Sequence, residues 1–133
     1  MLEDALRAVI PQELSAFPRL TEEGDHYFFD RWDRDGDTGL PLLRYTYWSP
    51  DGTREYRKRI IIPEVERLLE SAICAGEMGR EDFKTHCPRT DSNGPCAFAV
   101  IVAAFEHLGI VRRTAWGVYS IVNREKARTI LEA

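Results

Sequence analysis

Three aspartates alternate with other residues in one short segment of the chain, as Asp33, Asp35 and Asp37. Calcium-binding loops place carboxylate oxygens at this spacing. An EF-hand-type loop also needs Gly at its sixth position and Glu at its twelfth, where this chain has Thr38 and Arg44. Because the flanking residues have the composition of strands rather than helices, the segment is better interpreted as a solvated hairpin turn than as an ion site.

The cysteines and histidines are the other side chains that could ligate a metal. His86, Cys87 and Cys96 fall near one predicted turn, with Cys74 upstream. Zinc sites usually contain a pair of cysteines with two residues between them, and the adjacent His86 and Cys87 are poorly placed to share an ion. The three histidines have no neighbouring nucleophile motif, and the chain contains no glycine-rich phosphate loop. We therefore predict no metal, no cofactor and no catalytic residue, and the sequence favours a protein that is not an enzyme.

A group of basic and aromatic residues in the first half suggests a different chemistry, contact with nucleic acid. The basic residues are Arg54, Arg57, Lys58 and Arg59, and the aromatic residues near them include Tyr45, Tyr47, Trp48 and Tyr56. Sheets with this composition can stack bases and hold phosphates. Aromatic residues in strands are more often core, however, and basic residues on edge strands deter aggregation. We treat the four basic residues as a secondary candidate patch for nucleic acid.

Composition places the chain among small globular proteins. Its 133 residues suffice for one domain or two very small ones, and 44% of them are apolar and 30% charged. No apolar run has the length of a membrane span, and the N-terminal residues lack the basic flank and apolar core of a secretory signal. Three irregularly spaced cysteines fit a reducing compartment, so we expect a cytoplasmic protein that does not enter a membrane. The net charge of −4 disfavours strong non-specific binding to nucleic acid and leaves room only for a local basic face.

The chain divides at Pro63 into two predicted units, residues 1–62 and 63–133. In the first unit, residues 2–9 have the spacing of a short amphipathic helix, and Pro11 and Pro18 bracket a second short helical piece. Residues 25–62 contain three segments rich in aromatic and branched residues, separated by the turn sequences RDGDTG and PDG. We predict that these segments form a three-stranded antiparallel meander and that the whole chain has an α+β fold.

The second unit contains residues that typically begin and end helices, and two strand segments that can form a hairpin. Pro63 suits the first turn of a helix with Glu64 on its solvent face, and a short polar helix follows. The turn PRTDSNG is predicted to cap a long apolar helix over residues 95–108. The buried stripe of that helix comprises Phe98, Ile101, Val102, Phe105 and Leu108. Two strand segments, IVRRT and GVYSIV, come next, and Asn123 is placed to cap a last helix over residues 124–131.

This order of helix, helix, helix and hairpin, together with the phrase FEHLGIVRRTAWGVYSIV, resembles the winged helix-turn-helix superfamily over residues 63–123. The resemblance implies a DNA-binding domain, often a transcription regulator, whose third helix lies in the major groove and whose wing touches the DNA backbone or minor groove. It also implies nucleic-acid-binding residues in the turn before the third helix and in the wing. These candidates are Arg89, Thr90, Ser92, Asn93, Arg112, Arg113 and Trp116.

The third helix departs from this pattern, because its second face is also apolar. That face comprises Cys96, Val100, Ala103 and His107, of which only His107 could read a base edge. A helix that is apolar all round is normally buried, so we expect this face to be covered by the meander or by a second copy of the chain. Two-fold association is the commonest way for a small domain to hide such a face, and we therefore predict a homodimer.

Two functions remain open. The predicted wing and the turn before the third helix retain basic and polar groups, which favours a nucleic-acid-binding regulator with double-stranded DNA as its partner. The sealed third helix favours the alternative, a protein–protein interaction or dimerisation module that binds no DNA. Because the predicted wing retains basic groups, the sequence favours the first function over the second.

Overall fold

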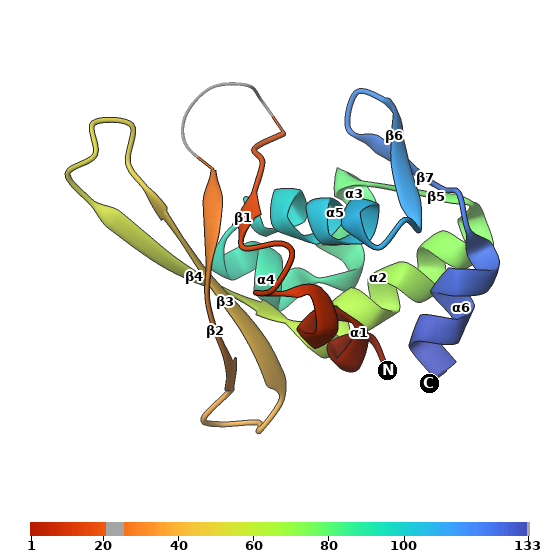
Figure 1. Ribbon diagram of the computed structural model, residues 1–133, viewed down its shortest axis with the longest axis horizontal. Coiled ribbons are helices and arrows are strands. Elements are labelled where there is room, and N and C mark those ends of the chain that lie inside the picture. The colour runs from red at the N-terminus through yellow and green to blue at the C-terminus, as the bar shows by residue number, and fades with distance from the viewer. Residues whose placement is uncertain (21–25, 133) are drawn as a thin grey trace.

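Residues 1–20 and 26–132 are described by the computed structural model of this chain, and they form two antiparallel sheets and six helices (Figure 1). The elements in chain order are α1 (Leu2–Val9), β1 (Ala16–Phe17), β2 (Tyr27–Arg34), β3 (Pro41–Trp48), β4 (Glu55–Ile61), α2 (Ile62–Ala75), β5 (Glu77–Gly79), α3 (Arg80–His86), α4 (Pro88–Asn93), α5 (Ala97–His107), β6 (Val111–Ala115), β7 (Val118–Ile121) and α6 (Arg124–Glu132). The predicted α+β class is confirmed. The predicted start of the meander at residue 25 and the predicted end of the second unit at residue 133 lie outside the described residues.

The first sheet has four strands in the order β1-β2-β3-β4, and all neighbours are antiparallel. Its last three strands are the predicted meander. Strand β1 lies where a second short helical piece was predicted between Pro11 and Pro18, so that prediction is wrong at these residues, and two residues are too few to show an alternating pattern. In it, Phe17 is fully buried and pairs with Tyr27 of β2. The predicted three-stranded meander is thus corrected to a four-stranded sheet.

Strand β3 shows how the first sheet divides its side chains between two faces. Leu43 and Tyr45 point to the inner face, which packs toward α5, and both are buried. Arg44 lies between them in the sequence and points to the opposite, outer face, where it is paired in register with Arg59. The sheet therefore has one apolar face that belongs to the core and one outer face that carries arginines.

The second sheet joins the predicted β6–β7 hairpin to the short strand β5, in the order β5-β7-β6. Strand β5 follows α2 directly, where Gly76 takes a φ of 89° and ends the helix in a left-handed conformation. Its central residue, Met78, is fully buried, but three residues are again too few for prediction. After β7, Asn123 caps α6 as predicted, and its side-chain oxygen accepts a hydrogen bond from the backbone N–H of Lys126 at 3.1 Å.

The turn PRTDSNG contains a helix of its own, α4, instead of capping the next helix. Glu64 explains this difference, because its carboxylate accepts hydrogen bonds from the backbone N–H groups of Arg89 and Thr90 at 3.1 and 2.8 Å. It thereby satisfies donors in the first turn of α4 that have no partner within the helix. Glu64 is only 2% exposed, so its predicted position on the solvent face of α2 is wrong. Helix α5 begins at Ala97 rather than at residue 95, without a side-chain cap.

Helix α5 lies at the centre of the structure, and every residue from Ala97 to Phe105 is buried (Figure 1). The predicted inward stripe is confirmed. The second face is covered as well: Val100 and Ala103 are 0% and 8% exposed. The Cys96 thiol lies 3.0 Å from the Tyr45 hydroxyl of β3.

The cover over the second face of α5 comes from the same chain. The side chains around Val100 belong to α1, the first sheet and α2, with Leu6, Leu43 and Val65 among them. His107, at the end of this face, is exposed, and its Nε2 atom lies 3.1 Å from a carboxylate oxygen of Glu13. A second copy of the chain is not needed over this face, so the reason for predicting a homodimer has no support in the structure.

Candidate functional site

The β6–β7 hairpin turns through Trp116 and Gly117, and the glycine takes a φ of 71° that side-chain-bearing residues rarely adopt. Trp116 is 74% exposed, the largest value among the exposed large hydrophobic side chains of the described residues. The Arg113 guanidinium lies over its ring, 5.7 Å from the ring centroid. Register places Arg113 opposite Tyr119, while Arg112, one residue earlier, points to the other face of the hairpin.

A groove lies beside this hairpin, above α5, and we call it the hairpin groove. It consists of two adjoining hollows of about 180 Å³ each, which share Leu20, Arg113 and Tyr119. In Figure 1, the β6–β7 hairpin and the segment after β1 stand on opposite sides of α5, and they supply the two walls. The lining also contains charged and aromatic side chains, namely Arg19, Arg80, Phe98, Glu106 and Trp116.

Three guanidinium groups border the groove, and each lies over an aromatic ring. Arg80 lies 5.3 Å from the centroid of the Phe98 ring and donates a hydrogen bond to a backbone carbonyl at 2.9 Å. Arg19 lies 4.7 Å from the centroid of the Tyr27 ring, and Arg113 lies over the ring at the hairpin tip. A contact with a ring orients a planar guanidinium without neutralising its charge. The groove is therefore a site where positive charge and flat apolar surface occur together.

Glu106 is the one carboxylate among the described residues that line the groove. Burial raises the pKa of Glu106, and the nearby charge of Arg113 opposes this rise. Burial also raises the pKa of the Tyr119 phenol, and the charge of Glu106 adds to that effect. The phenol therefore stays protonated at neutral pH, and Glu106 takes up a proton more readily than an ordinary glutamate does.

The candidates in the turn before the long helix lie on α4, and two of them have structural partners. Thr90 is fully buried, and its hydroxyl donates to Glu64 at 2.7 Å and accepts from the backbone N–H of Ile61 at 3.1 Å. The side-chain oxygen of Asn93 accepts from the backbone N–H of Arg59 at 2.9 Å. These bonds hold α4 against β4. The prediction that Thr90 contacts nucleic acid is thus wrong, and the Asn93 oxygen is already engaged.

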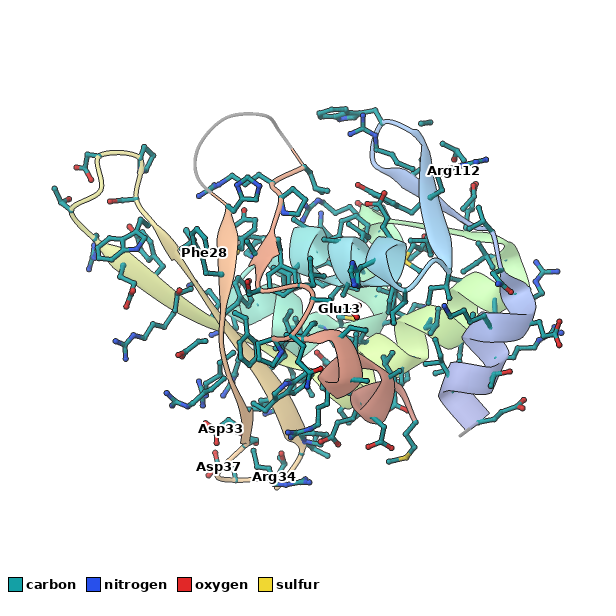
Figure 2. All side chains as sticks on the ribbon, in the orientation of Figure 1. Glu13, Phe28, Asp33, Arg34, Asp37 and Arg112 are labelled. Atoms are coloured by element: carbon teal, nitrogen blue, oxygen red, sulfur yellow. The ribbon has the colours of Figure 1, made fainter. Side chains whose placement is uncertain are left out.

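The remaining candidates do not form one surface. Arg89 lies beside the β2–β3 turn, with its Nη2 atom 3.8 Å from a carboxylate oxygen of Asp35, and Ser92 is exposed. Figure 2 shows the labelled residues of this turn at the end of the molecule opposite to Arg112. Among the predicted nucleic-acid-binding residues, the ones that meet in the hairpin groove are Arg113 and Trp116.

The secondary basic patch is divided between the two faces of the first sheet. Lys58 is half-buried on the inner face, whereas Arg57 and Arg59 point outward. Each of these two arginines has a carboxylate oxygen within 3.6 Å. Arg54, next to β4, is exposed and lies 5.6 Å from the centroid of the Tyr56 ring. The four residues predicted as one patch therefore do not all lie on one face of the sheet.

Further arginine–carboxylate pairs occupy the rest of the outer face. Arg44 donates a hydrogen bond to Asp33 at 2.7 Å, and Arg31 lies 3.7 Å from the same carboxylate. The hydrogen bond from Arg44 holds the pKa of Asp33 below its usual range, and the Thr38 hydroxyl does the same for Asp35. Both carboxylates are therefore ionised at neutral pH and offset the charge of the arginines around them.

The acidic turn and the cysteines do not converge on an ion. Within residues 1–20 and 26–132, no group of three or more His, Cys, Asp or Glu side chains is placed to hold one. Burial raises the pKa of the Cys87 thiol to about 12, so this residue is a neutral core side chain. Cys74 is exposed, and Cys96 is half-buried beside Tyr45.

Arg19 and Arg80 were not predicted as site residues. Arg80 begins the short polar helix α3, and Arg19 follows Pro18 in an irregular segment, so both have the local pattern of ordinary surface charge. Their approach to Arg113 results from the packing of β1, α3 and the β6–β7 hairpin around α5. No local feature of the sequence signals that convergence.

Comparison of the chain with protein-family models, with curated proteins and with solved structures gave no match. No helix in the described part of the chain is both long enough and apolar enough to cross a membrane. The function has therefore to be inferred from the geometry and charge of the hairpin groove.

Proposed function

We propose that this protein is a nucleic-acid-binding regulator of the winged-helix type, which contacts its ligand with the β6–β7 hairpin and the hairpin groove. The observation that carries the proposal is the groove itself, where guanidinium groups lie over aromatic rings and Glu106 is the one carboxylate among the described residues of the lining. Arginine and aromatic side chains in one groove are the groups that hold phosphates and stack on bases.

The order of the elements supports the winged-helix part of the proposal. Helices α2, α3 and α5 precede the β6–β7 hairpin, and β5 adds a third strand after the first of these helices, in the sheet order β5-β7-β6. In this interpretation the hairpin is the wing and α4 is an additional helix before the third helix. The wing then touches the nucleic-acid backbone, as the sequence resemblance implies.

Helix α5 takes no part in base reading under this proposal. A recognition helix must present polar side chains to the major groove, whereas the residues of α5 from Ala97 to Phe105 are buried by the chain itself. Affinity is therefore expected to come from phosphate contacts by the hairpin and the groove, and to be strongly salt-dependent. The net charge of −4 makes such contacts local to this face.

Fluorescence anisotropy with labelled DNA, both duplex and single-stranded, tests the proposal. We expect binding at low salt and an affinity that falls steeply as salt is added. Arg113→Ala should weaken binding and reduce the slope of log K against log salt by about 1, because it removes one phosphate contact. Arg57→Ala is the matched control, since it removes the same charge from an arginine already paired with Glu55 on the outer face of the first sheet.

The second candidate function is a protein–protein interaction module. It is favoured by the closed α5 and by Trp116, because exposed tryptophans with arginines beside them often anchor protein interfaces. If the parent protein binds neither duplex nor single-stranded DNA at low salt up to about 100 micromolar, the weak end of non-specific binding, the regulator proposal fails and this candidate takes its place.

A further inference from the structure

We infer that the hairpin groove holds one unpaired base of a single-stranded nucleic acid, with the adjoining phosphate on the arginines at its rim. The inference rests on the proposed function and specifies the ligand of the same groove. It replaces the double-stranded partner predicted from the sequence with single-stranded nucleic acid.

The dimensions of the groove suit a single nucleotide of a longer strand. Each of its two hollows has about 180 Å³, whereas sites for drug-sized molecules usually have roughly 300–1,000 Å³. Both hollows open to solvent, and they adjoin each other at Leu20, Arg113 and Tyr119. A planar group in one hollow and a charged group in the next can therefore belong to the same polymer.

The hollow beneath the hairpin tip provides a stacking surface. Phe98 and Tyr119 meet edge to face there with ring centroids 5.9 Å apart, and both are at most 2% exposed, so these core rings support the hollow from beneath and leave Trp116 as the ring on which a base can stack. Trp116 stands at the mouth of the same hollow and is 74% exposed, which packing within the chain does not explain. Exposed aromatic rings beside basic side chains are the platforms on which single strands stack their bases.

The second hollow provides the place for a phosphate. Arg113 borders both hollows, so a phosphate in the second hollow meets its guanidinium. Arg80, at the first hollow, uses one N–H group for the Pro95 carbonyl, and a guanidinium carries five N–H donors in total. Glu106 lies in the second hollow and opposes a phosphate there, so it limits the affinity without removing the site.

A duplex cannot use the stacking surface, because its bases are paired and stacked on one another. A duplex would meet the hairpin only through its phosphates, and the buried α5 offers it no base-reading side chain. The exposed ring of Trp116 can stack on a base only where that base is free.

Three labelled ligands measured by anisotropy on the full chain at one low salt concentration test the inference. They are an oligothymidine of about 12 nucleotides, the same backbone with its bases removed, and the oligothymidine paired with its complement. We expect the oligothymidine to bind about 5- to 150-fold more tightly than the abasic strand, the effect of stacking one base, and more tightly than the duplex.

Three exposed residues of the hairpin supply the variants. Trp116→Ala should lower the affinity for oligothymidine to that for the abasic strand and leave the abasic affinity unchanged. Arg113→Ala should weaken the binding of both strands. Arg112→Ala is the matched control, because it removes the same charge from the opposite face of the same strand, and it should weaken the binding of both strands less than Arg113→Ala does. Thermal melting checks that each variant keeps the fold of the parent.

The outcomes separate the inference from the function on which it rests. Equal affinities for oligothymidine and the abasic strand would overturn the inference, while the proposed phosphate-binding function would stand. Tighter binding of the duplex than of the single strand would also overturn it. Displacement of the oligothymidine by an oligoglutamate peptide at equal charge concentration would assign the groove to acidic peptides instead. If none of the three ligands binds, the proposed function and the inference both fail.

Discussion

The outer face of the first sheet and the hairpin groove are built from the same kinds of residue, but their arginines are held differently. On the sheet, Arg44 donates to Asp33 at 2.7 Å, and Asp35 lies 3.6 and 3.8 Å from two further guanidinium groups. In the groove, Arg80 and Arg113 lie over aromatic rings, 5.3 and 5.7 Å from the centroids. On the outer face of the sheet, carboxylates neutralise the arginines. In the groove, the rings leave the charge of Arg80 and Arg113 in place.

This difference decides which surface can bind an anion. An exposed ion pair contributes little to stability, but it cancels the field that would attract a phosphate. A ring positions a guanidinium and leaves its charge in place. The number of arginines on a surface is therefore a poor guide to its function, and the partner of each arginine is a better one. On this view, changes on the sheet side alter stability and changes in the groove alter binding.

The largest expected effect comes from the sheet side, with Glu64→Ala. Its carboxylate accepts hydrogen bonds from the N–H and hydroxyl of Thr90 and from the N–H of Arg89. Removing it leaves buried donors without partners, at about 1–3 kcal/mol each, so the free energy of unfolding should fall by about 2–5 kcal/mol. Chemical denaturation measures the change. Glu70→Ala, at an exposed glutamate of the same helix, should stay within about 0.5 kcal/mol of the parent.

The binding affinity of the same variant tests whether the sheet side and the hairpin groove act independently. Under conditions where Glu64→Ala is still folded, its affinity for single-stranded DNA should equal that of the parent, because the hairpin groove does not include α4. A parallel loss of stability and binding would mean that the two surfaces are coupled, and the division between them would be wrong.

The fold was predictable where long segments repeat a pattern. The buried stripe of α5, from Phe98 to Leu108, follows from helical spacing, and the meander follows from strand composition and its turns. The strands β1 and β5 were not predictable, because two or three residues adopt the conformation of the strand beside them. Glu64 was predicted to face solvent since charged residues usually do, and only its tertiary contact with α4 explains its burial.

The site was predictable only in part. Arg113 and Trp116 were identified because the hairpin that contains them corresponds to the DNA-contacting wing of the winged helix-turn-helix superfamily, which the sequence resembles. Arg19 and Arg80 come from other parts of the chain, and only the packing around α5 brings them to the same groove. Thr90 was wrongly predicted to bind nucleic acid, because a threonine in a polar turn gives no sign that a buried glutamate will bind its hydroxyl.

A smaller effect is expected if the arginines of the sheet are released from their carboxylate. Asp35→Asn removes the charge that faces Arg59 and Arg89. The outer face should then attract phosphates, and the slope of log K against log salt should steepen by up to about 2 for duplex DNA. Asp37→Asn, in the same turn, makes the same change of charge at an exposed position without a described arginine partner. If both variants bind like the parent, pairing with carboxylates is not what keeps the sheet from binding.

The smallest expected effect concerns Glu106, the carboxylate of the hairpin groove. Its charge opposes a phosphate, so Glu106→Gln should tighten the binding of oligothymidine by about 1.4- to 5-fold, since exposed charge pairs are worth about 0.2–1 kcal/mol. Burial raises the pKa of Glu106, so on acidification the carboxylate in the parent is neutralised at a higher pH than an ordinary glutamate is. The affinity of the parent should therefore rise on acidification, and that of Glu106→Gln should rise less.

The groups around Glu106 determine how this pH dependence is assigned. The Tyr119 phenol, whose pKa is raised by burial, stays neutral on acidification. His107 follows Glu106 on α5, and its Nε2 atom lies 3.1 Å from a carboxylate oxygen of Glu13, outside the hairpin groove. A comparison of His107→Gln with Glu106→Gln therefore shows which of the two side chains causes the pH dependence of binding. If His107→Gln keeps the rise in affinity and Glu106→Gln loses it, the carboxylate in the groove opposes the phosphate; the reverse result would place the effect outside the groove and remove Glu106 from the site.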